Sequence, residues 1–153
     1  MQSLTSPQTT THVDLGEAIQ RALQTFARVS LGLILFLAGL DGLLEVLPHP
    51  SKPLPERALL FAGALLRSGY FFPLLKGTEL VAGLLLLSNR LAPLGVANLA
   101  PVVVNIVALH LFLAPDGLAL AVILLALELY LAWTCRRAFR PLLGTRRETG
   151  GGR

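Results

Sequence analysis

The stretch that decides the fold is residues 117–135, GLALAVILLALELYLAWTC. It contains a single formally charged side chain, Glu128. A helix that crosses a bilayer needs about 20 predominantly apolar residues, within a range of about 17–25. The stretch is long enough and apolar enough to meet that requirement. It therefore predicts a transmembrane helix with one carboxyl group near its middle.

Three further apolar runs have the same character. They cover residues 27–47, 70–87 and 91–113. Across the whole chain 54% of residues are hydrophobic and 14% are charged, whereas soluble domains carry about 25% charged residues. We therefore predict an all-α protein, a four-helix transmembrane bundle of up-down topology. The lipid bilayer is its first expected partner.

The connections between the runs support this order of helices. Residues 47–55, LPHPSKPLP, cannot be helical, because proline removes backbone donors and restricts the preceding residue. Residues 56–68 are then predicted to form a helix too short to span, lying at the interface or re-entering the membrane. The turns at 89–90 and 114–117 are short, which predicts antiparallel neighbours.

Basic residues predict the orientation of the bundle. We divide the chain into a disordered cytoplasmic tail (1–14), a membrane domain (15–143) and a basic cytoplasmic tail (144–153). Nine basic residues fall on the side of both termini: Arg21, Arg28, Arg90, Arg136, Arg137, Arg140, Arg146, Arg147 and Arg153. Three fall on the other side: Lys52, Arg57 and Arg67. The positive-inside rule therefore predicts cytoplasmic N- and C-termini.

Polar side chains inside the predicted spans are the candidate functional residues, because burying such groups in hydrocarbon is costly. Six of them form the candidate polar cluster: Asp41, Lys76, Glu79, Asn105, His110 and Glu128. With a helical rise of about 1.5 Å per residue, they converge on the outer half of the bundle, with Glu128 near mid-depth. No catalytic role is assigned to any of them.

Helical spacing gives the expected facing of these groups. Lys76 and Glu79 are three residues apart and share a helix face. His110 is rotated by about 140° from Asn105, so we expect it to face a different neighbour or the headgroups. Each residue also has a structural alternative: an ion pair that fixes register, an amide that bonds a neighbouring helix, or a protonated Glu128 that only donates a hydrogen bond. Glycines in the first two spans are predicted to let helices approach closely: Gly32, Gly39, Gly77 and Gly83.

Charge balance predicts the protonation of the cluster. If Asp41, Glu79 and Glu128 were all ionised against Lys76 alone, the interior would hold an excess of about two negative charges. Desolvation disfavours the charged form of a carboxyl group, so at least one should be neutral. Glu128 is the strongest candidate, since its own helix offers no nearby base.

Several classes of function are excluded by what the sequence lacks. The single cysteine, Cys135, rules out an intramolecular disulfide and a dithiol pair. His110 is the one histidine within a span, so one chain cannot supply two axial histidines to a haem. No zinc-protease, phosphate-loop or serine-hydrolase motif occurs, and we expect no metal site. The basic residues cluster at the tail, so we expect no nucleic-acid binding.

Four segments of the chain resemble the DoxX family of small bacterial membrane proteins. They are SGYFFPLLK at 68–76, GLLLLSNR at 83–90, LAPVVVNI at 99–106 and FRPLL at 139–143. The likeness covers residues 28–143. Glu79 matches the family's acidic position in the second span, and Asn105 with His110 matches its third-span pattern. Asp41 stands where many relatives carry an amide or a lysine, so the resemblance gives it no role.

The resemblance implies a multi-pass protein of the bacterial plasma membrane. Because the family is associated with membrane redox complexes, we expect an accessory subunit of a quinone-linked redox complex, with redox proteins as partners and no catalysis by this chain alone. The sequence itself establishes no cofactor, and a quinone is the candidate ligand. Two alternatives remain open: a small proton-coupled transporter, and a structural or assembly protein without a ligand. A homo-oligomer is also left open.

Overall fold

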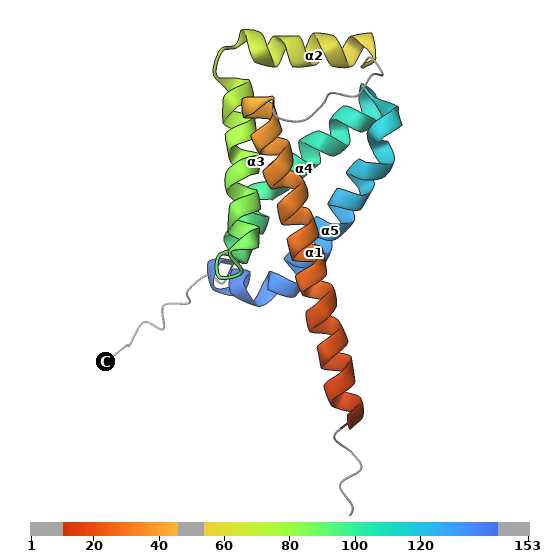
Figure 1. The fold of residues 1–153 in the computed structure, drawn as a ribbon, viewed down its shortest axis with the longest axis vertical. Helices are drawn as coiled ribbons and strands as arrows, with labels where there is room; N and C mark the ends of the chain where they lie inside the picture. The colour runs from red at the N-terminus through yellow and green to blue at the C-terminus, as the bar shows by residue number, and fades with distance from the viewer. Residues whose placement is uncertain (1–10, 46–53, 144–153) are drawn as a thin grey trace, which may run out of the picture.

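Helices make up nearly all of the described chain. The computed structural model describes residues 11–45 and 54–143, and no strand occurs within those ranges. The all-α prediction is therefore confirmed for this part of the protein. The elements, in chain order, are α1 (Thr11–Leu44), α2 (Glu56–Arg67), α3 (Phe71–Leu87), α4 (Ala92–Phe112), a 3-10 turn η1 (Pro115–Gly117) and α5 (Leu118–Leu143) (Figure 1).

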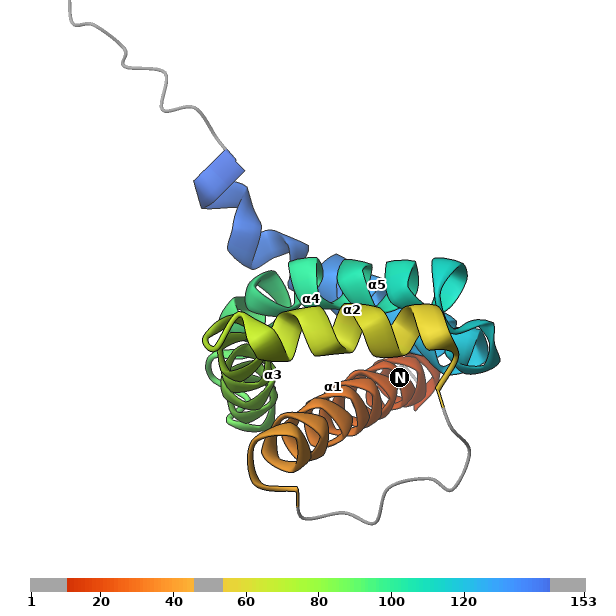
Figure 2. The same cartoon turned by 90° about the horizontal axis from the view of Figure 1, so that it is seen from above.

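The four long helices alternate in direction (Figure 1). The start of α1, the turn between α3 and α4 and the last turns of α5 lie at one end, which we call the termini end. The α2 helix and η1 lie at the opposite end, which we call the α2 end. Viewed from above, α2 crosses the bundle (Figure 2). Helices joined by the short connections thus run in opposite directions.

Within the described residues, three helical segments are long and apolar enough to cross a membrane: Leu15–Leu44, Ala92–Phe112 and Pro115–Phe139. The α3 helix has 17 residues, at the lower limit of spanning length. It counts as a fourth span only together with α2, from which it turns by 95°. The turn falls at Ser68–Tyr70, where Gly69 has a φ of 75° that other residues rarely adopt.

Helix boundaries differ from the prediction at both ends of the chain. The helix α1 begins at Thr11, within the stretch 1–14 that we expected to be a tail, and runs without a break to Leu44. No proline interrupts that range, so the polar start and the first span form one helix. Similarly, α5 continues past Cys135 to Leu143. Residues 1–10, 46–53 and 144–153 lie outside the described chain, and with them parts of the predicted tails, loop and first span.

The tightest packing joins α1 to α3 through glycines. A Cβ atom added at Gly83 would lie 2.6 Å from the backbone nitrogen of Phe36, and one at Gly39 would lie 2.6 Å from that of Leu80. The predicted close approach is thus confirmed at Gly32, Gly39 and Gly83. The prediction is wrong for Gly77, where an added Cβ would meet nothing within 4 Å.

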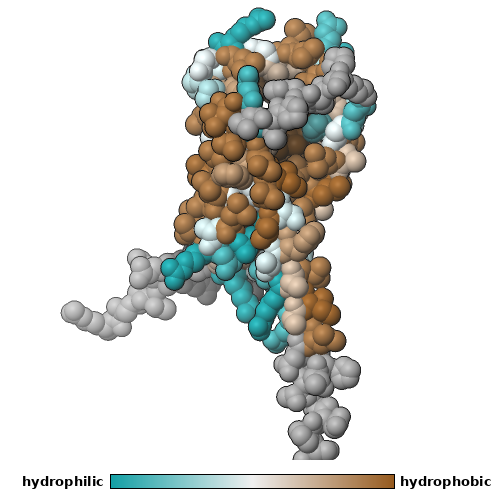
Figure 3. Space-filling model, in the orientation of Figure 1, coloured by the Kyte–Doolittle hydropathy of each residue, from teal (hydrophilic) through white to brown (hydrophobic). Residues whose placement is uncertain are grey.

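Large apolar side chains cover the outside of the bundle. Figure 3 shows an apolar band over its middle, with hydrophilic residues toward the ends. Half or more of the side-chain surface is exposed at Leu84, Leu94, Val104, Ile123 and Leu129. An exposed apolar surface of this extent is unfavourable in water and is what a lipid environment requires. The described helices therefore have the surface of a membrane protein.

Candidate functional site

A cavity of about 310 Å³ lies at the α2 end of the bundle. We call it the α2 cavity. All five α-helices line it, and α2, which crosses the end of the bundle (Figure 2), contributes Phe61, Ala62 and Leu65. Its walls are mostly aliphatic and aromatic, with Leu35, Phe61, Phe72, Ile106 and Leu124 among them. Its volume is near the lower limit of small-molecule pockets, about 300 Å³.

Four members of the candidate polar cluster line this cavity: Lys76, Glu79, Asn105 and His110. The first two come from α3 and the last two from α4. The sequence places these groups at a similar depth, and the fold brings them to the same cavity. The site therefore combines an apolar enclosure with a few polar groups, as ligand pockets generally do.

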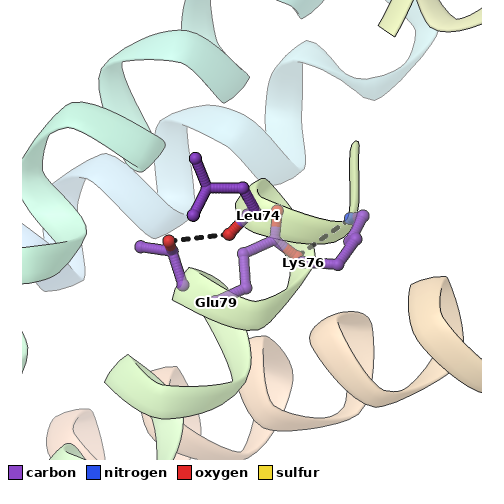
Figure 4. A network of polar contacts seen from close by, with 4 residues as sticks. Leu74, Lys76 and Glu79 are labelled. Carbon is purple, nitrogen blue, oxygen red and sulfur yellow. Dashed lines mark hydrogen bonds and ion pairs between the residues drawn. The ribbon is translucent and has the colours of Figure 1, made fainter. Parts of the chain in front are cut away.

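Lys76 and Glu79 form an ion pair on α3 (Figure 4), with 2.9 Å between Lys76 Nζ and Glu79 Oε2. The side chain of Glu79 is only 4% exposed and that of Lys76 is 21% exposed. The lysine stem crosses Gly42 of α1, where an added Cβ would collide with it. Lys76 Nζ also lies 5.9 Å from the centre of the Phe72 ring.

The neighbouring Thr78 hydroxyl donates a hydrogen bond to the Leu74 carbonyl (2.8 Å), so this hydroxyl is already engaged within α3 (Figure 4).

Asn105 and His110 supply the polar groups on α4. The Asn105 amide makes no hydrogen bond to another described residue, so its donors and acceptor are available to a ligand. His110 Nδ1 lies 2.9 Å from the Ala114 carbonyl oxygen. Because a carbonyl only accepts, Nδ1 carries a proton, and Nε2 of the neutral ring is an acceptor. The ring packs against Gly117, and both Asn105 and His110 line the α2 cavity.

The other two members of the cluster lie elsewhere. Asp41 is partly exposed near the end of α1 and does not line the α2 cavity. Glu128 is buried on α5, 4% exposed, and also lies outside the cavity lining. Neither of its carboxyl oxygens has a hydrogen-bond partner within residues 11–45 and 54–143. The structure therefore separates Glu128 from the four cavity residues.

The sequence prediction missed the contribution of α2. This helix supplies Phe61, Ala62 and Leu65 to the cavity. Together with the buried Ala58 they follow the spacing i, i+3, i+4, i+7, which marks one face of an amphipathic helix. That pattern was available in the sequence and could have identified the side of α2 that faces the bundle.

A second cavity, of about 460 Å³, lies at the termini end. We call it the arginine cavity, because Arg21, Arg28 and Arg90 line it. The Arg28 guanidinium donates to the Leu86 carbonyl at 2.6 Å, near the end of α3. Arg28 thus adds a second donor to a carbonyl near the end of α3 that also accepts a backbone hydrogen bond from Asn89 at 3.4 Å.

The α2 cavity has the chemistry of a binding site for a hydrophobic molecule with hydrogen-bonding groups. Its apolar walls favour a ring or chain, while the ammonium group, the amide and the imidazole can fix the orientation of polar atoms. No family model matches the chain, no curated protein is significantly similar to it in sequence, and no solved structure is significantly similar to it.

Proposed function

We propose that this protein is an accessory membrane subunit that binds the headgroup of a quinone in the α2 cavity and serves a quinone-linked redox complex. The observation that carries the proposal is the composition of the cavity. An ion pair, an amide and an imidazole converge in an otherwise apolar enclosure. A quinone ring is apolar and carries two carbonyl acceptors, so it complements these walls.

Each polar group has a role in this binding mode. The Lys76 ammonium has three N–H donors and gives one to Glu79, so others remain for a quinone carbonyl. The Asn105 amide can donate to a carbonyl or accept from a hydroxyl. His110 Nε2 is an acceptor in the neutral ring, which suits the hydroxyl of a reduced quinol. The site could thus hold both redox states.

We also propose that the chain is a member of the DoxX family, because four of its segments resemble that family. Three of the four polar groups lining the cavity, Glu79, Asn105 and His110, belong to that resemblance. On the same ground we propose that the chain does not catalyse a reaction alone and that redox proteins of the membrane are its partners.

We further propose a four-span topology in the bacterial plasma membrane, with α3 as the shortest span, α2 at the outer interface and both termini cytoplasmic. Two arginines lie on α2 at the α2 end, Arg57 and Arg67. Five described arginines lie toward the termini end: Arg21, Arg28, Arg90, Arg136 and Arg137. The positive-inside rule places the richer end in the cytoplasm. A periplasm-dependent reporter enzyme fused after residue 153 should be inactive, and an active fusion would reverse the orientation.

Quinone binding should depend on Asn105 and not on the other asparagine of α4. We expect Asn105→Leu to weaken binding of a short-chain quinone by about tenfold or more, because losing one ligand hydrogen bond costs about 1–2 kcal/mol and about 1.4 kcal/mol is tenfold. Titration calorimetry on the purified protein in lipid nanodiscs measures the dissociation constant.

The matched control is Asn98→Ala. The Asn98 amide donates to the Thr78 carbonyl and does not line the cavity, so this variant should bind the quinone as the wild type does. The proposal is rejected if the wild-type protein binds no quinone, or if Asn105→Leu binds it unchanged.

A further inference from the structure

The α2 cavity and the arginine cavity lie at opposite ends of one bundle, and each of the four long helices reaches both. On each helix we pair the two residues of the two linings that lie nearest to each other along the chain: Arg28 and Ile34 on α1, Leu86 and Glu79 on α3, Val96 and Asn105 on α4, and Leu131 and Leu124 on α5. The two members of each pair lie about two turns of helix apart. With a rise of about 1.5 Å per residue, the layer between the cavities is about 9–14 Å thick.

This layer is built almost entirely from apolar side chains. Leu31, Ala82, Leu99 and Val103 lie between the paired residues of their helices, and each is 0% exposed. Asn98 also lies at this depth, but its amide is engaged with the Thr78 carbonyl at 3.4 Å. We call this layer the bundle floor.

Glu128 is the residue that α5 contributes to the bundle floor. It follows Leu124 of the α2 cavity by four residues and precedes Leu131 of the arginine cavity by three. Residues three and four apart share a helix face, so the three side chains form one stripe. All three are buried. Along the helix axis, Glu128 is about 6 Å from one lining residue and about 4.5 Å from the other.

No described charge compensates this carboxyl group. The charged and titratable side chains described on the other long helices lie at the two cavities or the bundle ends and not in the bundle floor: Glu17, Arg21, Arg28 and Asp41 on α1, Lys76 and Glu79 on α3, and His110 on α4. None of them bonds to Glu128 in the described chain, and both of its oxygens are without a partner there.

An isolated carboxylate in such surroundings is highly unfavourable, whereas a neutral carboxylic acid is tolerated more easily. The group can lose its proton only where water or a counter-charge reaches it, and the two cavities are the nearest places that offer either. We propose that Glu128 is a proton carrier that exchanges its proton with one cavity or the other, so that the protein passes protons through the bundle floor. This function is independent of quinone binding.

The exchange needs no other reactant. At one cavity a hydronium ion gives a proton to the Glu128 carboxylate, leaving water and the carboxylic acid. At the other cavity the acid returns its proton to water, and the carboxylate forms again. Only O–H bonds form and break, and nothing is oxidised or reduced.

Proton flux into sealed vesicles tests the proposal. The full-length protein is reconstituted into liposomes that contain a pH-sensitive dye, and a potassium gradient with valinomycin drives proton entry. Wild-type protein should acidify the lumen faster than protein-free vesicles do, and Glu128→Gln should reduce the rate to the protein-free level. The control Glu17→Gln removes an exposed carboxylate at the start of α1 and should leave the rate unchanged.

Chemical labelling of the wild type makes the test independent of how the variant folds. Dicyclohexylcarbodiimide reacts with protonated carboxyl groups in apolar surroundings, so it should modify Glu128, as peptide mass spectrometry would show, and stop the flux. Wild-type flux equal to that of empty vesicles, unchanged flux in a folded Glu128→Gln variant, or unchanged flux after complete labelling would each overturn the proposal. None of these results bears on quinone affinity.

Discussion

Replacing Gly83 with leucine is expected to push α1 away from α3 and to destabilise the protein by about 3 kcal/mol, at the upper end of the usual cost of overpacking. The reason is that an added Cβ would already lie 2.6 Å from the backbone nitrogen of Phe36 and 2.8 Å from the carbonyl oxygen of Gly32. Backbone atoms cannot move aside as the end of a flexible side chain can. Thermal unfolding in detergent, followed by circular dichroism, measures the effect.

Gly77→Leu is the matched control on the same helix. An added Cβ at Gly77 meets nothing within 4 Å, and leucine is the better helix former by up to about 1 kcal/mol. The control variant should therefore unfold at the wild-type temperature or above it. Equal unfolding temperatures for Gly83→Leu and Gly77→Leu would show that the glycine contact between α1 and α3 is not as described.

The second large effect is expected from Lys76→Met, which leaves the buried Glu79 carboxyl group without its partner. Removing one member of a buried ion pair typically costs about 3–5 kcal/mol, and we expect about 3 kcal/mol here because Lys76 is partly exposed. The double variant Lys76→Met/Glu79→Gln removes both charges and should recover most of the lost stability. Urea or thermal unfolding of the wild type and the variants completes the double-mutant cycle.

This cycle also addresses the alternative of a structural protein without a ligand. If Lys76 and Glu79 only fix the packing of α3, the double variant should bind quinone as the wild type does. Under the proposed function it should be stable and yet bind quinone less tightly. A Lys76→Met variant as stable as the wild type would mean that the pair does not stabilise the bundle.

The helices themselves were largely predictable, because lipid imposes a simple requirement on length and hydrophobicity. The runs at 91–113 and 117–135 predict α4 and α5 closely at their starts, where a proline and a glycine mark the turns. The end of α5 was not predictable from hydrophobicity, because the apolar run ends at Cys135 while the helix continues. No glycine or proline lies between Leu118 and Arg140 to end it, and arginine is a good helix former.

The sequence predicts the depth of the polar side chains of the candidate site in the bundle. It does not predict which way each helix turns them. A helical rise of about 1.5 Å per residue places the polar groups of α3 and α4 at a similar level. Whether two helices turn those groups toward one cavity depends on how each helix is rotated in the bundle, which one helix alone does not determine. His110 illustrates this. Its offset from Asn105 is about 140° on an ideal helix, but the cavity is wider than one helix face and includes both residues.

Glu128 is a second residue whose depth, but not whose neighbours on other helices, was predictable from the sequence. Its predicted depth is consistent with its place in the bundle floor, one turn from Leu124 and one turn from Leu131. The separation of the bundle interior into two cavities and an apolar floor is a property of packing between helices. For that reason a single-helix pattern groups Glu128 with the residues of the α2 cavity, and the structure does not.

The most direct test of the central claim is to find where a quinone binds along the chain. A photoreactive quinone analogue is equilibrated with the protein in lipid nanodiscs, activated by light, and located by peptide mass spectrometry. We expect labels on Phe61, Leu65 and Ile106, which line the α2 cavity, and we expect excess unlabelled quinone to prevent them. Labels confined to lipid-facing residues such as Leu84, Leu94 and Val104, unaffected by competition, would contradict the account.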